Sequence, residues 1–534
     1  MKSRIAVATL LCAAVAHAQP GAEQTSPPPT LDPGQGPEAD KGLAVKLEEI
    51  IAIAVRTAPD LARARVDRTA AIHTATAARH SQSWTLTSSA SYSSNGVSDQ
   101  TQVAPYSQVG QDTLSIGIGL MRNLPTGGSI SINTGVQSQH TEYDVPGNIA
   151  GSGSSSGAVA ISALSLQESE DAFNVSTQAG FTYKQPLGRG FGGVATADIK
   201  KAEINASEAT LKAQMAAEDM LKDLVTSYWE LAYSSYEVDI RYQSLELARK
   251  QEGVTHEQIR GGLASPSALS QVEYEIDNRQ EAALRSQLDL EQKSMEMRMK
   301  AGLEISRRDV VMRPSEPLEI GKDEPEFDAE EVIAKSRIAN RKLATVALEG
   351  KLSDVDIEVA RDAAKPQIDL SVSGALIGTA DNAGDSVANV AGGGGYQVSI
   401  GLNMSFELSG AARRNKDAAL AKRRRLDVDR ADVERQIEVQ TALAVRQVAA
   451  ARYRVELEDR AIAVAEDNVR NERAQFMAGK TTNYNVLQRQ GELIDAHLKR
   501  GRAVADYHIA VAQLEYLSGS LLGDYGVDVI PHDG

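Results

Sequence analysis

The chain has little of several things that many folds and enzymes depend on. Of its 534 residues, one is cysteine (Cys12) and only 4% are aromatic. Beyond Cys12 there can be no disulfide and no thiolate metal site. The low aromatic content argues against a large conventional hydrophobic core. No segment after residue 18 has 18 uninterrupted apolar residues, so no transmembrane helix is expected.

The first 42 residues predict an exported protein with a disordered leader. Residues 1–18 have the form of a secretory signal: two basic residues, the apolar stretch Ile5 to Val15, and the small-x-small cleavage site Ala16-His17-Ala18. The apolar stretch is far shorter than the roughly 20 residues that a spanning helix needs. Residues 19–42 are rich in Pro and Gly and are expected to be disordered.

The formal charge is strongly acidic, at −16, and loss of Lys2 and Arg4 with the signal takes it to −18. This argues against bulk nucleic-acid binding. One basic cluster stands out, and we interpret it as a solvated or ion-paired helical face because acids follow it directly. The cluster is Arg413, Arg414, Lys416, Lys422 and Arg423 to Arg425, and the acids are Asp427, Asp429, Asp432 and Glu434.

A long internal duplication organises the sequence. Residues 47–61 match residues 329–343 at an offset of 282, whereas residues 262–265 match 479–482 at an offset of 217. The first copy therefore holds 65 extra residues, within about 81–186. Each copy runs helix, strands, very long helix, tight turn and helix, so we expect two structural repeats.

Six segments alternate apolar and polar residues with the period of a β-strand. Ser, Gly, Asn and Thr fill most of the alternate positions, which makes one face apolar and the other polar. Four segments lie in the first copy and two in the second: 84–92, 114–120, 130–136, 173–183, 368–372 and 398–408. The pattern is typical of an outer-membrane barrel, and equally of a soluble antiparallel sheet.

Connection lengths and the export signal favour the barrel. Segments 93–111, 140–171 and 374–396 are long and rich in Gly, Ser and Asp, whereas 122–128 is a tight turn. Barrels alternate long outer loops with short periplasmic turns. The 65 extra residues would then be an added strand pair with its loop.

Both copies predict helices too long for one globular core. Residues from about 195 to 259 carry no helix breaker and would span roughly 97 Å. Residues from about 411 to 476 are their counterpart, and an opening helix (about 45–82) and a return helix (about 267–303) together match one long helix. Two coiled-coil seams are predicted. The first runs through Leu221, Leu224, Tyr228, Leu231, Ser235, Val238, Tyr242 and Leu245, and a weaker one through Val439, Leu443, Ala450, Tyr453 and Leu457.

Motifs that would indicate chemistry are weak. Residues 188–193 spell G-x-G-x-x-G, but the helix that follows is several times too long for a βαβ unit, so we interpret these glycines as a strand-to-helix corner. The histidines are scattered and no G-x-S-x-G is present. We therefore expect no catalytic residue, no metal site, no cofactor and no enzymatic activity.

With these residues the chain resembles the TolC-like outer-membrane efflux factors, over about residues 43–519. The resemblance is carried by Leu47 to Ala54 with Pro59-Asp60-Leu61, by Gln185 to Gly193, and by the signature from Phe476 to Leu487. It implies an α+β fold in which a trimeric outer-membrane β-barrel is continuous with a long periplasmic α-helical coiled-coil barrel, built from two internal structural repeats. Family members normally give four strands per chain, so six would make eighteen in the trimer instead of twelve.

The resemblance also implies the function. It points to a homotrimer in the outer membrane of a Gram-negative bacterium, with a large periplasmic part and with outer-membrane lipid around it. Such a duct passively exports small molecules or proteins, in tripartite efflux or type I secretion. A proton-driven or ATP-driven inner-membrane pump delivers the cargo through a periplasmic adaptor (membrane fusion) protein. Two rivals are a coiled-coil structural or adhesive outer-membrane protein without a pump partner, and a stand-alone porin.

The two hairpin tips are the implied docking and closing points. Family adaptors dock at tips with a V-G-L-[AT] motif. The similar residues here are Gly261, Gly262, Leu263 and Ala264, with Gly479, Lys480 and Thr481 as their counterpart. Well-known members place aspartates six and nine residues after the second-tip glycine and an arginine two after it. This chain has Asn485, Gln488 and Thr481 there, and the aperture would also involve Ala268 and Phe476.

We divide the chain accordingly into six parts. They are the signal peptide (1–18), a disordered leader (19–42), repeat 1 (43–305), a linker (306–325), repeat 2 (326–519) and a C-terminal tail (520–534).

Closure without an acidic ring predicts weak block by trivalent cations. Asn485 and Gln488 are neutral, so a trivalent ion added to the helical side should reduce conductance only slightly. Planar-bilayer recording measures this. Strong block of the unmodified channel would contradict the prediction, and N485D/Q488D should introduce such block.

Overall fold

The computed structural model of the chain describes residues 42–96, 107–144, 172–262, 264–303, 310–321 and 326–527. The predicted signal peptide, nearly all of the leader and the last seven residues lie outside this range. All described secondary structure belongs to one unit, Leu43–Gly534.

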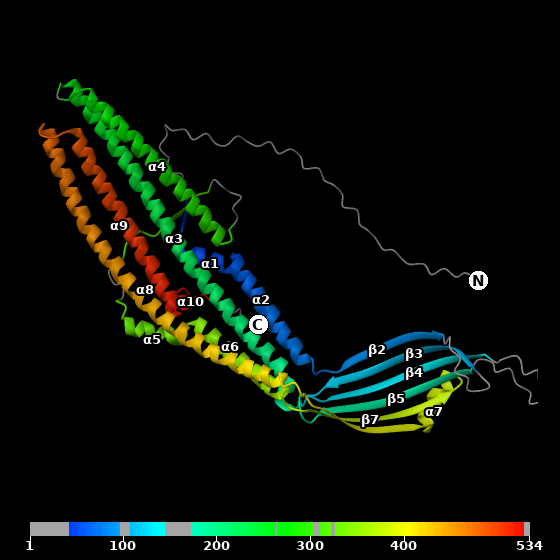
Figure 1. Ribbon diagram of the computed structural model, residues 1–534. Coiled ribbons are helices and arrows are strands. Elements are labelled where there is room, and N and C mark those ends of the chain that lie inside the picture. The colour runs from blue at the N-terminus through cyan, green and yellow to red at the C-terminus, as the bar shows by residue number, and fades with distance from the viewer. Residues whose placement is uncertain are drawn as a thin grey trace, which may run out of the picture. The chain divides into compact units, whose positions relative to one another are not determined.

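The four longest helices of this unit form two hairpins (Figure 1). The first joins α3 (Ala197–Arg260) to α4 (Ser267–Lys300), and the second joins α8 (Ala411–Met477) to α9 (Asn483–Ser518). The sequence predicted the bounds of α3, α4 and α8 within a few residues, and for α9 it predicted a helix without bounds. Helix α3 is central, because it packs against α2 and α4 as well as against α6 and α9.

The predicted opening helix of residues 45–82 was wrong in one respect, since the chain breaks in it. Helix α1 (Leu47–Thr57) ends before Pro59, which is the first residue of α2 (Pro59–His80). Proline lacks an N–H and forces the preceding residue out of the helical region, and Ala58 is accordingly extended. In the second copy Asn340 makes the same break between α5 (Ala329–Ala339) and α6 (Arg341–Ala363).

The stacking of shorter helices along the long one is confirmed. Arg79 at the end of α2 pairs with Glu203 near the start of α3, at 2.8 Å. Further along α3, Lys300 of α4 donates to the Ser227 hydroxyl at 2.7 Å. Helices α2 and α4 therefore cover successive lengths of α3.

The seam predicted on α3 is buried. Seven of its eight residues are buried and Tyr242 is partly so. They pack with residues from both flanking helices, including Ile50, Leu61 and Met297. Burial of each such large side chain stabilises the fold by about 1.5–3 kcal/mol, which makes this seam the main core.

The seam predicted on α8 is not buried within the chain. Val439, Leu443, Tyr453 and Leu457 are exposed, each by 42–58%. A second row, spaced 4 and 3 residues apart, is buried in their place: Ile437, Thr441, Ala444, Val448, Ala451 and Val455. Its small residues allow α8 to approach its neighbours closely. Helix α8 thus carries two stripes, one buried and one exposed.

All six predicted strands form one antiparallel sheet. The strands are β2 (Thr85–Gly96), β3 (Ser107–Asn123), β4 (Ser129–Asp144), β5 (Ala172–Pro186), β7 (Gln367–Ala380) and β8 (Tyr396–Ser405). They are ordered β2-β3-β4-β5-β7-β8, so the pairing of β5 with β7 joins the two halves of the chain. Residues 97–106 and 145–171, where long loops were predicted, lie outside the described range.

The third predicted loop, 374–396, was wrong. Strand β7 continues to Ala380, and α7 (Ala383–Gly392) follows, capped by the side chain of Asn382, which accepts from the Asp385 amide. This helix packs on β5 and β7, where the hydroxyls of Thr177 and Ser386 are 2.6 Å apart. Its apolar residues Ala383, Val387 and Val390 have helical spacing, a signal that the loop prediction missed.

Four short elements complete the description. Strands β1 (Leu43–Val45) and β6 (Met312–Pro314) pair in parallel, which places part of the predicted linker against α3. The 3-10 turn η1 (Gly192–Thr196) leads into α3. In the predicted tail, α10 (Leu521–Asp524) packs into the core through Leu521. No helix among the described residues has the length and apolar character to cross a bilayer.

The G-x-G-x-x-G segment forms a corner between strand and helix, as predicted. A Cβ at Gly188 would lie 2.3 Å from the Pro366 carbonyl oxygen, so only glycine fits there. Gly190 and Gly192 have φ values of +88° and +79°. The Gly190 amide donates to the Asp362 carboxylate at 2.5 Å, which ties the corner to the end of α6.

G188A should therefore destabilise the fold by about 1–3 kcal/mol, because the added methyl overlaps the Pro366 carbonyl. Thermal unfolding of the purified protein in detergent measures this. The matched control is G193A, in the same loop, where a Cβ would have only the Lys200 ammonium nearby, at 3.8 Å. Equal loss of stability in both variants would refute this account of the corner.

Candidate functional site

The strand register separates the sheet into an apolar and a polar face. One row across all six strands consists of Leu86, Leu120, Ile132, Phe181, Gly374 and Val398. The large side chains of this row are exposed by 41–68%. The neighbouring row consists of Thr87, Gly119, Asn133, Gly180, Ala375 and Gln397. An exposed apolar face this large indicates a membrane or a protein partner.

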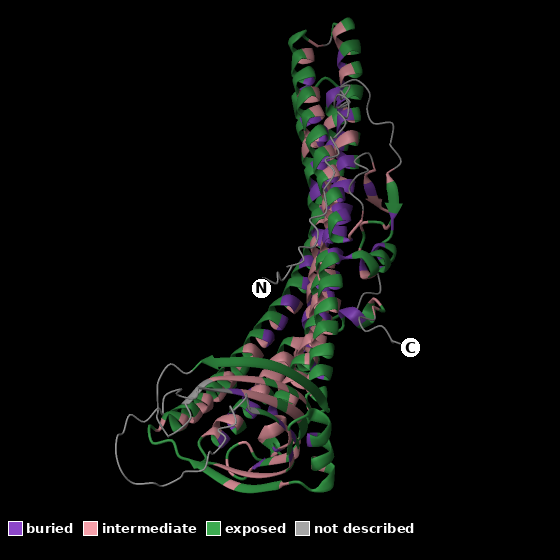
Figure 2. Ribbon diagram, turned by 90° about the vertical axis from the view of Figure 1, so that its right-hand side faces the viewer, coloured by how far each residue is buried: buried purple, intermediate pink, exposed green. Residues whose placement is uncertain are grey.

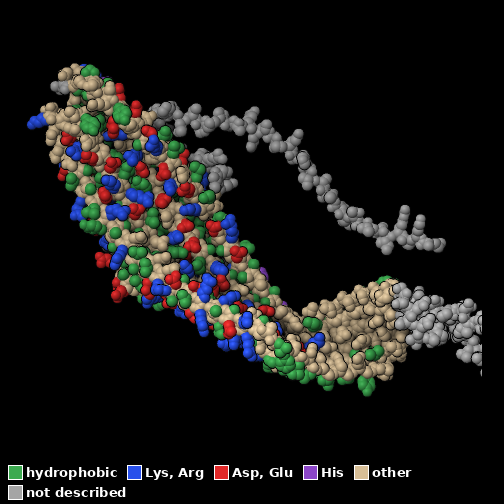
Figure 3. Space-filling model, in the orientation of Figure 1, with side chains coloured by type: hydrophobic (Ala, Val, Ile, Leu, Met, Phe, Trp, Pro, Cys, Tyr) green, Lys and Arg blue, Asp and Glu red, His purple; other side chains and the backbone are tan. Residues whose placement is uncertain are grey.

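The polar face is hollowed. A depression of about 290 Å³ is lined by side chains such as Thr87, Ser89 and Gln178. Glycines permit the curvature, because a Cβ at Gly119 would lie 2.9 Å from the Thr87 hydroxyl. Figure 2 shows the sheet curving, and the space-filling view shows few charged side chains on the face turned to the viewer (Figure 3). The sheet therefore has a concave polar side and a convex apolar side.

Both edges of the sheet are open among the described residues. Strands β2 and β8 each pair on one side only. Every residue of β2 is exposed, and β8 is exposed except at Gly401. Open edges present unpaired N–H and C=O groups and invite another strand.

The first hairpin tip is a glycine turn. Helix α3 ends at Arg260, Gly261 follows, and Gly262 has φ +72°. Both glycines are exposed, whereas Ala264 and Ala268 are partly buried. Leu263 lies outside the described residues.

The second tip joins several of the predicted residues. Gly479 has φ +71°, and the Lys480 amide donates back to the Gln475 carbonyl at 2.9 Å. The Thr481 hydroxyl donates to Glu472 and accepts from the Asn485 amide nitrogen at 2.9 Å. Phe476 is buried and Gln488 is exposed. Among the described residues, no hydrogen bond links Ala268 to this group.

A buried polar contact between the two hairpins was missed by the sequence reasoning. The Asn483 side-chain amide donates to the Thr255 hydroxyl at 3.1 Å, and both residues are almost fully buried. Nearby, the Arg279 guanidinium donates to the Leu487 carbonyl of the other hairpin at 3.4 Å. Continuing the spacing of the α3 seam from Leu245 gives residues 249, 252 and 256, which are one position past the buried Ala248, Gln251 and Thr255, so the seam gave no signal for this contact.

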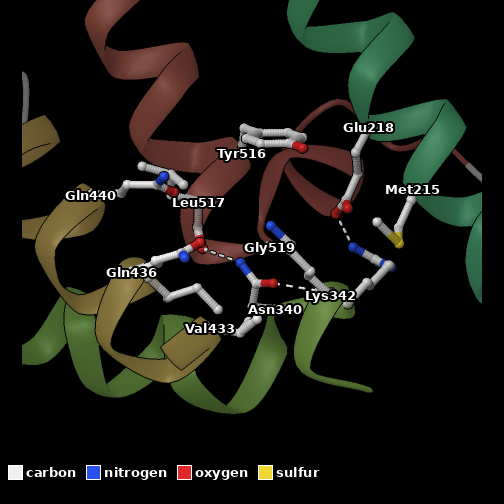
Figure 4. Close-up of a pocket in the computed structure, with 12 residues that line it drawn as sticks. Met215, Glu218, Asn340, Lys342, Val433, Gln436, Gln440, Tyr516, Leu517 and Gly519 are labelled. Atoms are coloured by element: carbon white, nitrogen blue, oxygen red, sulfur yellow. Dashed lines mark hydrogen bonds and ion pairs between the residues drawn. The ribbon is translucent and has the colours of Figure 1, made fainter. Parts of the chain in front are cut away.

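A small cavity of about 120 Å³ lies where α3, α6, α8 and α9 meet (Figure 4). Glu218, which is almost fully buried, pairs with Arg341 across it. The Asn340 side chain lies beside it and donates to the Leu517 carbonyl at 3.4 Å. These contacts hold the break between α5 and α6 against the other helices, which is a structural role.

Two titratable groups near the end of α9 are perturbed by burial. Burial raises the pKa of the Glu515 carboxyl to about 7, and the charge of Asp524 raises it further. Burial, followed by a hydrogen bond to Asp219, raises the pKa of Tyr516 to about 12. The described residues hold no group of three His, Cys, Asp or Glu side chains that could bind a metal.

Comparison with known proteins identifies the relatives. Residues 332–520 match the family model described as Outer membrane efflux protein. Solved structures with the same fold include VceC of Vibrio cholerae, at 14% identity and TM-score 0.64, covering 89% of this chain and 96% of that chain. The Campylobacter jejuni CmeC outer membrane channel has 12% identity and TM-score 0.64, covering 89% and 85%. The open Neisseria gonorrhoeae MtrE channel has 13% identity and TM-score 0.63, covering 89% of each chain. Curated protein sequences gave no match.

The perturbed Glu515 predicts a pH-dependent stability. Its pKa is about 7 in the folded protein and roughly 4.3 when unfolded, so folding is penalised as pH rises from about 4.5 to 7, and the penalty is complete above that. E515Q should gain about 1–3 kcal/mol at pH 8 and little at pH 5. Thermal unfolding at both pH values measures this, with E456Q at an exposed position as control. A gain that does not depend on pH would contradict it.

Proposed function

We propose that this chain is one subunit of a homotrimeric export duct. Residues 332–520 match the outer membrane efflux protein model, and the fold is that of solved outer-membrane channels. The duct would lie in the outer membrane of a Gram-negative bacterium, with its helices in the periplasm. It performs no chemistry and conducts cargo passively. Its two halves, each a helix pair, strands and a long hairpin, are the two repeats of the duct.

The open sheet edges carry this proposal. Strand β8 of one chain can pair with β2 of the next, which satisfies the backbone groups that each chain leaves unpaired. Three chains of six strands give an eighteen-stranded barrel, and counts of 16–18 leave an aqueous channel. The convex apolar face then meets lipid and the concave polar face lines water.

The exposed stripe on α8 supports the same assembly. Val439, Leu443, Tyr453, Leu457 and Val464 lie at coiled-coil spacing and are exposed by 42–61%. Water is a poor environment for such a stripe, and the matching surface of a neighbouring chain would bury it. Sheet and helices thus both lack a lateral partner.

The hairpin tips are the proposed contact with the periplasmic adaptor. Gly261, Gly262, Gly479 and Lys480 are exposed at the helix ends farthest from the sheet (Figure 1). Ala264 and Thr481 lie beside them. The adaptor would connect the duct to a proton-driven or ATP-driven inner-membrane pump, which supplies the energy and selects small molecules or a protein as cargo.

Closure is proposed to rest on neutral polar groups. Thr481, Asn485 and Gln488 at the second tip would form the aperture, with Phe476 and Ala268 as packing around it. The contacts of Asn483 with Thr255 and of Arg279 with the Leu487 carbonyl hold the hairpins together near this point. A polar contact in a seam is weaker than apolar packing, which suits two hairpins that must part.

A structural or adhesive protein is the alternative from a different class. It would use the coiled coil as a spacer and would have no need of a concave polar wall or of two complementary strand edges. Those two features favour the duct.

The duct proposal predicts a heat-resistant trimer that forms ion-conducting pores in planar bilayers, and drug or metal sensitivity when the gene is deleted. L443E places a charge in the exposed α8 stripe and should abolish both trimer and pores. A449E, at an exposed position about 120° around the same helix, should preserve them. A soluble monomeric wild-type protein, or equal behaviour of the two variants, would sink the proposal.

A further inference from the structure

The helix-side end of the sheet combines exposed apolar side chains with basic ones at three separate corners. At the β2 edge, Trp84 is half exposed, and the Arg122 guanidinium lies 5.9 Å from its ring centroid. At the corner after β5, Leu187 and Phe191 are half exposed on either side of Arg189. Aromatic rings beside cationic groups are typical of a membrane–water interface.

The corner between β8 and α8 is the most strongly charged. Phe406 and Leu408, exposed by 61% and 98%, continue the apolar face beyond the last residue of β8. Between Ala411 and Arg425 the chain has seven basic residues and one acid, Asp417, in a protein whose net charge is −16. Figure 3 shows the basic side chains along α8 next to the hydrophobic margin of the sheet.

Only part of this cluster is ion-paired, and the rest is exposed to solvent, as the sequence interpretation allowed. Arg423 pairs with Asp354 and Asp427, and Arg425 pairs with Asp429. No ion pair joins Arg413, Arg414, Lys416, Lys422 or Arg424 to any acid in the described part of the chain. Glu407, the nearest acid before the helix, is engaged with the Ser409 hydroxyl and the Ala412 amide.

Arg413 and Arg414 add two positive charges at a helix end where Glu407 supplies one negative charge. Both lie in the first turn and a half of α8, near the positive end of the helix dipole, and the first turn contains no acid. They are exposed and about 3–5 Å along the axis from Ala411. A bilayer leaflet has about 5–7 Å of headgroups outside its hydrocarbon. Lys422 and Arg424 are about 16–20 Å along the axis, beyond this layer.

We propose that Arg413, Arg414 and Lys416 bind the headgroups of anionic phospholipids in the leaflet that meets the helix-side end of the sheet. Arg122 and Arg189 would continue this belt around the barrel. The lipid phosphate neutralises these three basic side chains, with which no acid of the described residues pairs, and the acyl chains cover Phe406 and Leu408. This inference rests on the proposed membrane position of the sheet.

The test compares lipid retention by the full-length processed trimer in nanodiscs of phosphatidylethanolamine with and without 20% phosphatidylglycerol, about the composition of a bacterial membrane. Native mass spectrometry counts bound phosphatidylglycerol, and trimer dissociation on heating gives its effect on stability. Wild type should retain phosphatidylglycerol and dissociate at a higher temperature when it is present. R413E/R414E should lose at least about tenfold in retention.

The matched control is K422E/R424E, which changes the charge equally on the same helix but outside the headgroup layer, and which should behave as wild type. Charge reversal could prevent insertion of the protein into the membrane, so R413Q/R414Q serves as a second variant that only removes the charges. It should also retain less phosphatidylglycerol than wild type. Inorganic phosphate at millimolar concentration should not displace the lipid.

Three results would overturn the inference: no preference of wild type for phosphatidylglycerol, equal loss in the two double variants, or displacement by inorganic phosphate. Conductance separates this outcome from failure of the duct proposal. Wild type that forms pores in both lipid mixtures without preferring phosphatidylglycerol would contradict the lipid site alone. Wild type that forms no pores in either mixture would contradict the duct.

Discussion

Unpaired backbone groups along β2 and β8 are the constraint on which the rest of this structure depends. Each edge strand alternates apolar and polar side chains, so neither water nor lipid suits the whole edge. A second strand satisfies the hydrogen bonds and keeps both faces in their own solvents. In the proposed duct, closure into a barrel, a fixed number of chains and a continuous polar lumen all follow from meeting that one requirement.

The two long helices differ in whether the chain itself buries their large apolar residues. The seam of α3 is buried within the chain by α2 and α4, so α3 acts as the internal support. Helix α8 buries a row of small residues and leaves its larger apolar residues outside. The α3 seam is therefore covered within the chain, whereas the α8 stripe stays exposed, as the proposed trimer requires.

The sequence predicted where the two hairpins turn. It did not predict the contacts between the hairpins or the partner of the α8 stripe. Glycine-containing breaks after Arg260 and Met477 located both tips, because few other residues allow such turns. The contact between Thr255 and Asn483 could not be found, because it joins residues 228 positions apart on two hairpins. The α8 stripe was predicted as a coiled-coil seam, but whether the chain buries it could not be judged, because hydrophobic spacing identifies an interface without telling which chain supplies the other side.

The sequence by itself determined the local periods: which segments are strands, which are long helices, and where each turns. These depend on side-chain alternation, helix breakers and glycine, all of which act over a few residues. Only the tertiary structure decided that β5 pairs with β7, that α7 packs on the sheet, and that Ile437 rather than Val439 faces inward. Those choices compare burial and hydrogen bonding between distant segments, and no local pattern contains that comparison.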